Sequence, residues 1–480
     1  MKPTVLRTWL VAALLAFGQT EGRTATPREL PPLPAPAVML HVAPAPAGDD
    51  AHTGAAGHPF ATLTRARDAI RELKRNGPLP PGGVNVIVQS GEYRVDATWT
   101  LEARDSGTVE TPVVYRAADG EAPRFRGGVR LTGFDRVTDP ALRERLSEAA
   151  RERVVLVDLR AAGVTNLLSL KLGGFGSGHG FTTHSAHELF FNGRALPLAR
   201  GPNDGFLRIQ DVLVKDGTRG YDREGSKVGR LRYEGDRPAR WVNEPDLLLY
   251  GYWFWDWADS YERVATIDPT ARTIMLAEPF HRYGYSVGAP FYAVNALSEL
   301  DQPGEWYLDR AGGRLLLWPP EGPASATNEL STFPGTMVRF EGVSHVRLQG
   351  LTWELGSGDG LQILGGTNCL LAGVTVRHFA GNGVIIRDGT GHGLLSCDLH
   401  SFGRGAVVLA GGDRRTLSGG GHWVENCDLH ELSRIDRTYT PAIHVSGVGH
   451  EIRHNRMHDI PSSALRVDGN EHRIEFNEVF

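Results

Sequence analysis

The last 140 residues of the chain contain a repeat of short strands, and this repeat constrains the fold more than any other feature. Side chains of similar size return after 23, 23, 30, 28 and 22 residues, at Leu351, Val374, Cys397, Cys427, Asn455 and Asn477. Parallel columns run three residues earlier, from Leu348 to Ile474, and two residues later, from Trp353 to Val479. One such coil cannot bury its inner face, so the repeat predicts stacked coils with a shared core.

The predicted fold class is all-β: a right-handed parallel β-helix with an N-terminal capping helix and a β-rich, sandwich-like inserted domain. The 59 glycines agree with many turns between short strands. Cys397 and Cys427 fall in an inward column and are expected to act as small hydrophobic residues. A disulfide between these neighbouring coils is the alternative, although three cysteines are an odd number for a disulfide framework.

The region before the repeat predicts the first coils and their cap, over residues 38–135. Leu63, Ala66, Ile70 and Leu73 follow one face of an amphipathic helix that ends at Asn76-Gly77. Such a helix can cover the open end of the first coil. Residues 136–335 interrupt the repeat with alternating strands and predict the inserted domain, and residues 336–480 hold the remaining coils.

The N-terminus predicts export. Lys2 and Arg7 precede a short apolar run, so residues 1–25 are expected to be a signal peptide, followed by a proline-rich linker over 26–37. The expected location is secreted or periplasmic, with an uncleaved membrane anchor as the alternative. No later segment is apolar enough to span a membrane. The net charge of −5 offers no basic field for nucleic acid, so no nucleic-acid partner is expected. The chain is expected to be a monomer.

Acidic residues in register are the first candidates for chemistry. A glycosidase needs two carboxyl groups about 5 Å apart for retention, or about 6.5–9.5 Å apart for inversion. Asp398 and Asp428 occupy one outward column on successive coils and fit such a pair. Arg456 and Glu478 continue the same column, however, and an alternating ladder of exposed charges is the favoured interpretation. No catalytic residue is assigned.

Histidines form two further columns. One contains His392, His422, His450 and His472, and the other contains His400, His430 and His458. Imidazole is a common metal ligand. Neither column shows a converging cysteine or carboxylate in the sequence, so both are interpreted as positions set by the repeat. We predict no metal site and no cofactor.

The two lengthened coils are the best candidates for a binding site, because function concentrates in loops added to a rigid scaffold. The longer insertion covers residues 411–420, and the other covers 434–445. The second brings together an acid, a cation, an aromatic ring and an imidazole, a mixture that suits a sugar. A structural Arg–Asp pair in a long turn is the alternative. The predicted substrate-binding residues are Asp436, Arg437, Tyr439, His444 and Asp468.

The stretch GYWFWDWADSY, residues 251–261, predicts a strand with three tryptophans on one face: Trp253, Trp255 and Trp257. These rings are candidates for a sugar-stacking platform. Tyr252 and Phe254 lie on the opposite face, which favours a strand packed on both sides.

Several longer segments carry a family resemblance. GHPFATLTRARDAIREL, HELFFNGRALPLARGPNDGF, ELDQPGEWYLDR and RTYTPAIHVSGVGHEIRHNRMHD resemble exported β-helix proteins like those of glycoside hydrolase family 141. The resemblance runs across nearly all the chain after the linker. It implies a pectin-lyase-like fold acting on complex, often plant-derived, glycans, with fucosidase and xylanase activities. It also implies that Arg437 and Tyr439 are cleft residues.

The resemblance places the family's catalytic acids after a strand that corresponds to IEFNEV. The chain ends in HRIEFNEVF, so we expect a C-terminally truncated β-helix, with poor solubility on its own and without those acids. The main hypothesis is a glycoside hydrolase with a two-carboxylate mechanism. An inactive fragment of such an enzyme is a variant of this hypothesis. The alternatives are a polysaccharide lyase or uronate epimerase, and a non-catalytic glycan-binding protein. In every case the partner is a polysaccharide or oligosaccharide.

Overall fold

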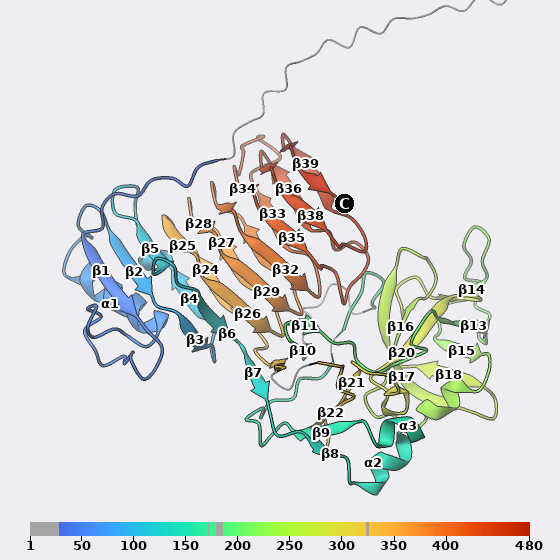
Figure 1. Cartoon of the computed structure of the whole chain (residues 1–480). Coiled ribbons are helices and arrows are strands. Elements are labelled where there is room, and N and C mark those ends of the chain that lie inside the picture. Colours follow the sequence, from blue (N-terminus) through green and yellow to red (C-terminus); the bar gives the residue numbers. More distant parts are fainter. Residues whose placement is uncertain (1–27, 171, 179–185, 323–325) are drawn as a thin grey trace, which may run out of the picture.

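A computed structural model describes residues 28–480, except 171, 179–185 and 323–325 (Figure 1). The predicted signal peptide lies outside the described residues. The fold is mostly β, and its main body consists of three long parallel sheets, consistent with the predicted parallel β-helix. Each coil contributes one strand to each sheet in turn.

The three parallel sheets are named here in the order in which the chain enters them. Sheet 1 contains β1 (Val38–Val42), β2 (Val84–Val88), β5 (Val113–Ala117), β25 (Val346–Gln349), β28 (Leu370–Ala372), β31 (Gly393–Leu395), β34 (Trp423–Glu425), β37 (Glu451–Arg453) and β40 (Arg473–Glu475). Sheet 2 contains β3 (Gly91–Arg94), β6 (Pro123–Arg126), β26 (Thr352–Gly356), β29 (Thr375–Phe379), β32 (Asp398–Phe402), β35 (Asp428–His430), β38 (Arg456–His458) and β41 (Glu478–Val479). Sheet 3 contains β4 (Trp99–Glu102), β24 (Val338–Glu341), β27 (Leu361–Leu364), β30 (Val384–Arg387), β33 (Val407–Gly411), β36 (Ile443–Val448) and β39 (Leu465–Asn470).

The strand register confirms the columns predicted from the repeat. Leu348, Leu371 and Leu394 are successive partners in sheet 1, and Trp353, Val376 and Leu399 in sheet 2. These side chains are buried and form one continuous core that also includes Cys397 and Cys427. All three cysteines are free thiols, so the alternative of an intercoil disulfide is wrong. The backbone N–H of Cys397 instead faces the Sγ atom of Cys427 at 3.4 Å.

The N-terminal helix α1 (Leu63–Arg75) packs beside β1 at one end of the stack (Figure 1). Leu63, Ala66 and Ile70 enter the main core, whereas Leu73 is 37% exposed. The helix begins where the Thr62 side chain accepts a hydrogen bond from the backbone N–H of Arg65. It ends at Asn76, as predicted.

Antiparallel strands occupy the chain between β6 and β24. They form four smaller sheets from β7 (Gly128–Leu131), β8 (Asp135–Arg136), β9 (Val155–Asp158), β10 (Leu189–Phe191), β11 (Arg194–Ala195), β12 (Arg200–Gly201), β13 (Leu207–Val212), β14 (Gly225–Ser226), β15 (Arg230–Tyr233), β16 (Leu248–Tyr252), β17 (Asp259–Asp268), β18 (Thr273–Leu276), β19 (Tyr285–Ser286), β20 (Pro290–Val294), β21 (Trp306–Asp309), β22 (Arg314–Leu317) and β23 (Asn328–Ser331). Two short helices, α2 (Pro140–Arg145) and α3 (Glu148–Arg151), lie among them. We call the segment from β7 to β23 the insert.

The insert interrupts the chain but not the stack. β4 pairs directly with β24, β5 with β25 and β6 with β26, so neighbouring coils stay in register across about 200 intervening residues. Figure 1 shows the insert beside the sheets near the middle of the stack. Within the described part of the chain, no helix combines the length and apolarity needed to cross a membrane.

Candidate functional site

The candidate site is a groove of about 610 Å³ on the outer face of sheet 3. Its floor is one outward column of the sheet, in which successive strands bring side chains into register: Gln362, Ile385, Val408, His444 and Arg466. Its wall is formed by the turns that lead into these strands, including Asp359, Asn382, Arg404 and Tyr439. Such a groove runs across several coils, as binding of an extended ligand requires.

The lengthened coil between β35 and β36 contributes a loop, within residues 434–445, to the groove wall. The insert holds this loop in place. Asp259, at the start of β17, accepts hydrogen bonds from the backbone N–H of Arg437 at 3.0 Å and from the Thr438 hydroxyl. It also accepts one from the Tyr250 hydroxyl at 3.0 Å. Burial raises the pKa of Asp259, although these hydrogen bonds oppose the shift. The loop is therefore anchored by a carboxylate about 180 residues away in sequence.

Three of the five predicted site residues gather at the groove. Tyr439 is 43% exposed and stacks on Phe175 of the insert, with ring centroids 4.1 Å apart. His444 lies on the floor, and its Nε2 atom is 2.9 Å from Oδ2 of Asp468. Arg466 donates to the same oxygen at 3.1 Å, so Asp468 orients both an imidazole and a guanidinium at the groove surface.

The other two predicted residues belong to the loop but do not line the groove. Asp436 is 3% exposed and faces Arg404, whose Nε atom is 3.2 Å from its Oδ2 atom. This pair matches the alternative interpretation of the sequence, in which an Arg–Asp pair stabilises the long turn. Arg437 turns to a second cavity of about 310 Å³ between the insert and the coils, where Tyr261 and Tyr292 are neighbours. The loop thus separates the groove from this inner cavity.

The tryptophan-rich stretch differs from its prediction. It is not one strand, because β16 ends at Tyr252 and β17 begins at Asp259, with a turn between them. Trp253 is fully buried, whereas Trp257 is 39% exposed and meets the Tyr439 ring edge-on, with centroids 6.2 Å apart. Trp255 stacks with Trp257 at 6.0 Å. The turn breaks the alternation that would have aligned all three rings, and it leaves two of them in a row that leads toward the groove.

The groove does not contain a carboxyl pair at glycosidase spacing among its described lining residues. Asp359 precedes β27 and Asp468 lies on β39, four coils away, which corresponds to about 19 Å at the usual strand spacing. The other candidates, Asp398 and Asp428, are partners in sheet 2 and not in the groove. Arg456 lies 3.5 Å from Asp428, as an alternating charge ladder requires.

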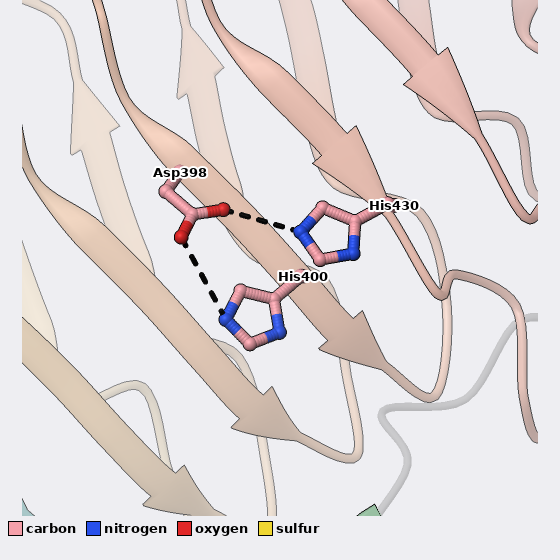
Figure 2. Close-up of side chains that lie close together, drawn as sticks. All are labelled: Asp398, His400 and His430. Carbon is pink, nitrogen blue, oxygen red and sulfur yellow. Dashed lines mark hydrogen bonds and ion pairs between the residues drawn. The ribbon is translucent and has the colours of Figure 1, made fainter.

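The two histidine columns have different environments. His392, His422, His450 and His472 stack inside the coils, and each Nδ1 atom accepts a backbone N–H from the preceding coil. In the other column, Asp398 converges on His400 and His430 (Figure 2). The prediction that no carboxylate meets this column is therefore wrong. It failed because His430 contacts an aspartate of the previous coil, 32 residues earlier.

Sequence reasoning did not identify Arg466, Phe175 or Arg404 as site residues. The repeat contained a signal for Arg466, since the short strands AIHV and ALRV align it with His444. Arg404 precedes the strand GAVVL and could have been found as a wall position in the same way. No sequence pattern linked Phe175 to Tyr439.

Comparisons with known proteins support the fold. No family model matches the chain, and no curated protein matches it. Among solved structures, a protein described as a glycoside hydrolase superposes with a TM-score of 0.69 and 17% sequence identity, over 90% of this chain and 80% of that chain. A complex of XylC with xylose gives a TM-score of 0.47 and 14% identity, over 92% of this chain and 63% of that chain. The first likeness shows a shared fold.

Proposed function

We propose that the chain is a secreted, monomeric carbohydrate-active protein, a right-handed parallel β-helix of the kind that hydrolyses complex polysaccharides, and that it binds its glycan in the sheet 3 groove. The observation that carries the proposal is the juxtaposition of Tyr439, His444 and Arg466 on one open surface. An exposed aromatic ring offers a face to a sugar ring, and the imidazole and guanidinium offer hydrogen bonds to hydroxyls. The family 141 resemblance favours a plant-type polysaccharide, and a protein described as a glycoside hydrolase shares the fold.

The cations of the groove favour a glycan that carries carboxylates. Arg387, Arg404 and Arg466 all line it, although Arg404 faces the buried Asp436 and Arg466 pairs with Asp468. Guanidinium groups bind carboxylates in a planar, bidentate geometry. A uronate-containing polysaccharide therefore suits the groove better than a neutral one, which keeps the lyase or epimerase alternative. The wide separation of the groove's carboxylates favours the non-catalytic alternative.

The test is binding followed by product analysis with the full chain. Affinity electrophoresis against neutral xylan, glucuronoxylan and homogalacturonan should show retardation in the two acidic polysaccharides. Tyr439→Ala should weaken binding to each bound glycan by about 5-fold, because it removes an exposed ring contact of about 1 kcal/mol. Arg466→Ala should weaken binding most to acidic glycans, because it removes a guanidinium that can pair with a carboxylate. Arg230→Ala, an exposed arginine on β15 of the insert, is the matched control and should bind like the wild type.

Product analysis then separates the activities. New reducing ends without ultraviolet absorbance indicate a hydrolase, an absorbing unsaturated uronide indicates a lyase, and retardation without either product indicates a binding protein. The proposed site is wrong if Tyr439→Ala and Arg466→Ala bind every glycan as tightly as the wild type does.

A further inference from the structure

We propose that Asp398, His400 and His430 form a binding site for one divalent transition-metal ion of the zinc type on the outer face of sheet 2. Figure 2 shows the Nε2 atoms of both imidazoles directed at the carboxylate. The three ligand atoms lie within 4.8 Å of one another. Two imidazoles and one carboxylate are a common ligand set for Zn²⁺ and neighbouring metals, and they leave a further position for water.

Stacking of the coils creates this site. Asp398 and His400 lie two residues apart on β32, so their side chains leave the same face of the strand. His430 is the register partner of His400 on β35, and the two rings stack with centroids 4.6 Å apart. His430 Nε2 lies 3.3 Å from one oxygen of Asp398, and His400 Nε2 lies 3.9 Å from the other. Small rotations of the side chains bring all three atoms to one centre.

The hydrogen bonds of His400 leave its Nε2 atom as a lone-pair donor for a metal. Ser401 donates its hydroxyl hydrogen to Glu431, with 2.6 Å between the oxygens. The same hydroxyl oxygen, 3.0 Å from His400 Nδ1, can then only accept, so Nδ1 carries the ring proton. The bare Nε2 of His400 therefore faces a carboxylate oxygen across a 3.9 Å gap, and a cation between them satisfies both.

The charges around the cluster also favour a cation. Asp398 is joined nearby by Asp428, its register partner on β35, and by Glu431, which directly follows His430 in the sequence. Arg377, the register partner of His400, is paired with Glu354 through two contacts of 2.8 and 2.7 Å. The Asp398 side chain is 49% exposed, so an ion can reach the site from solvent. The Ser401–Glu431 pair orients His400 as outer hydrogen bonds commonly orient metal-binding histidines.

The experiment uses the full chain, treated with a chelator and then titrated with ZnCl₂ by calorimetry, with bound zinc counted by elemental analysis. One equivalent should bind. Asp398→Asn keeps the side-chain shape and His430→Gln keeps a polar group, and each should weaken binding about 100-fold or more, while Ser401→Ala should weaken it about 10-fold. His458→Gln is the matched control, one coil further along the same column, and should bind like the wild type.

Cobalt substitution provides a measurement that does not depend on any variant folding. Co²⁺ bound to the wild type should give the visible spectrum of a low-symmetry site, and X-ray absorption of the zinc form should show two imidazole ligands. The proposal is overturned if less than a tenth of an equivalent binds, if Asp398→Asn binds zinc like the wild type, or if His458→Gln loses binding equally. Circular dichroism of each variant checks that the β signal is kept.

Discussion

The buried histidine ladder should make the stability of the fold fall steeply in acid. His422 is fully buried between the rings of His392 and His450. The Nδ1 atom of His422 accepts the backbone N–H of His392 at 3.3 Å. The backbone N–H of His422 in turn donates to Nδ1 of His450 at 3.1 Å. A proton on Nδ1 would turn this acceptor into a second donor. Burial lowers the pKa of His422 to about 3 and that of His392 to about 4.

The sign and size of the effect follow from proton linkage. The unfolded chain binds a proton at each of these histidines near the ordinary imidazole pKa of 6.5, and the folded chain does not. The stability that His422 contributes is therefore complete above pH 6.5 and is lost as the pH falls toward about 3. One proton corresponds to a slope of about 1.4 kcal/mol per pH unit, or a loss of about 2 kcal/mol for each histidine between pH 7 and pH 5.

The perturbation that isolates this term is His422→Asn. The chain shows that asparagine can fill such a position, because Oδ1 of Asn455 accepts the backbone N–H of Cys427 at 3.0 Å in a neighbouring column. Asparagine keeps the acceptor and does not titrate. Urea unfolding, followed by tryptophan fluorescence at several pH values between 7 and 5, should give a free energy of unfolding that falls less for the variant than for the wild type, by about 2 kcal/mol in total over this range.

Comparing the pH dependence of the unfolding free energy between wild type and variant removes the contributions of the other titrating groups. Glu262 and Glu305 have pKa values raised to about 7 by burial, and they act with the opposite sign over the same range. Both are present in the wild type and in the variant, so their effects cancel. His450→Asn should reproduce the change, because burial lowers the pKa of His450 too. Equal slopes for wild type and His422→Asn would refute the reasoning, since His422 would then bind its proton equally in both states.

Three further outcomes are expected. Asp259→Asn should lower the free energy of unfolding by about 2–4 kcal/mol, because the amide cannot accept all the hydrogen bonds that anchor the groove loop, and the same variant should bind glycan more weakly. Glu262 has a folded pKa of about 7 against 4.5 for an ordinary glutamate, so it stabilises the fold at low pH and loses that contribution as the pH rises through 7. Glu262→Gln should therefore gain about 3 kcal/mol relative to the wild type between pH 4.5 and pH 8 in urea unfolding. A thiol reagent should label no cysteine in the native protein and all of them in denaturant, since these three are buried and free: Cys369, Cys397 and Cys427. Labelling of the native protein would contradict that burial.

The sequence predicts the main body of the fold well because a parallel stack repeats one packing problem. Each coil must bury the same inward positions, so Leu399 and Leu429 return wherever the register demands them. In the column two residues earlier, cysteine and asparagine replace Leu351 at the equivalent positions Cys397, Cys427 and Asn455. Helix α1 was predictable for a similar reason, since burial of Leu63, Ala66 and Ile70 follows from the helical period alone.

Contacts between elements with no common period were not predictable. The tryptophan-rich stretch alternates like a strand, yet its backbone turns after Tyr252 because Trp253 packs in the insert core against Phe291. The stacking of Tyr439 on Phe175 joins two loops that share no repeat. The cluster at Asp398 was missed for the opposite reason. Each column was interpreted separately, whereas the contact runs diagonally, from one coil's aspartate to the next coil's histidine.

The position of the groove loop follows from the same stacking that defines the coils. Strand pairing holds β33, β36 and β39 at a fixed spacing of about 4.8 Å, so extra residues in a coil cannot be accommodated in the sheets and must leave the stack at a turn. A projecting loop loses the packing that orders a normal turn, and it needs another partner. Asp259 of the insert supplies that partner through the backbone of Arg437 and the hydroxyl of Thr438. The insert therefore does not cover the groove as a separate domain would; it holds the lengthened coil in the conformation that presents Tyr439 to the groove.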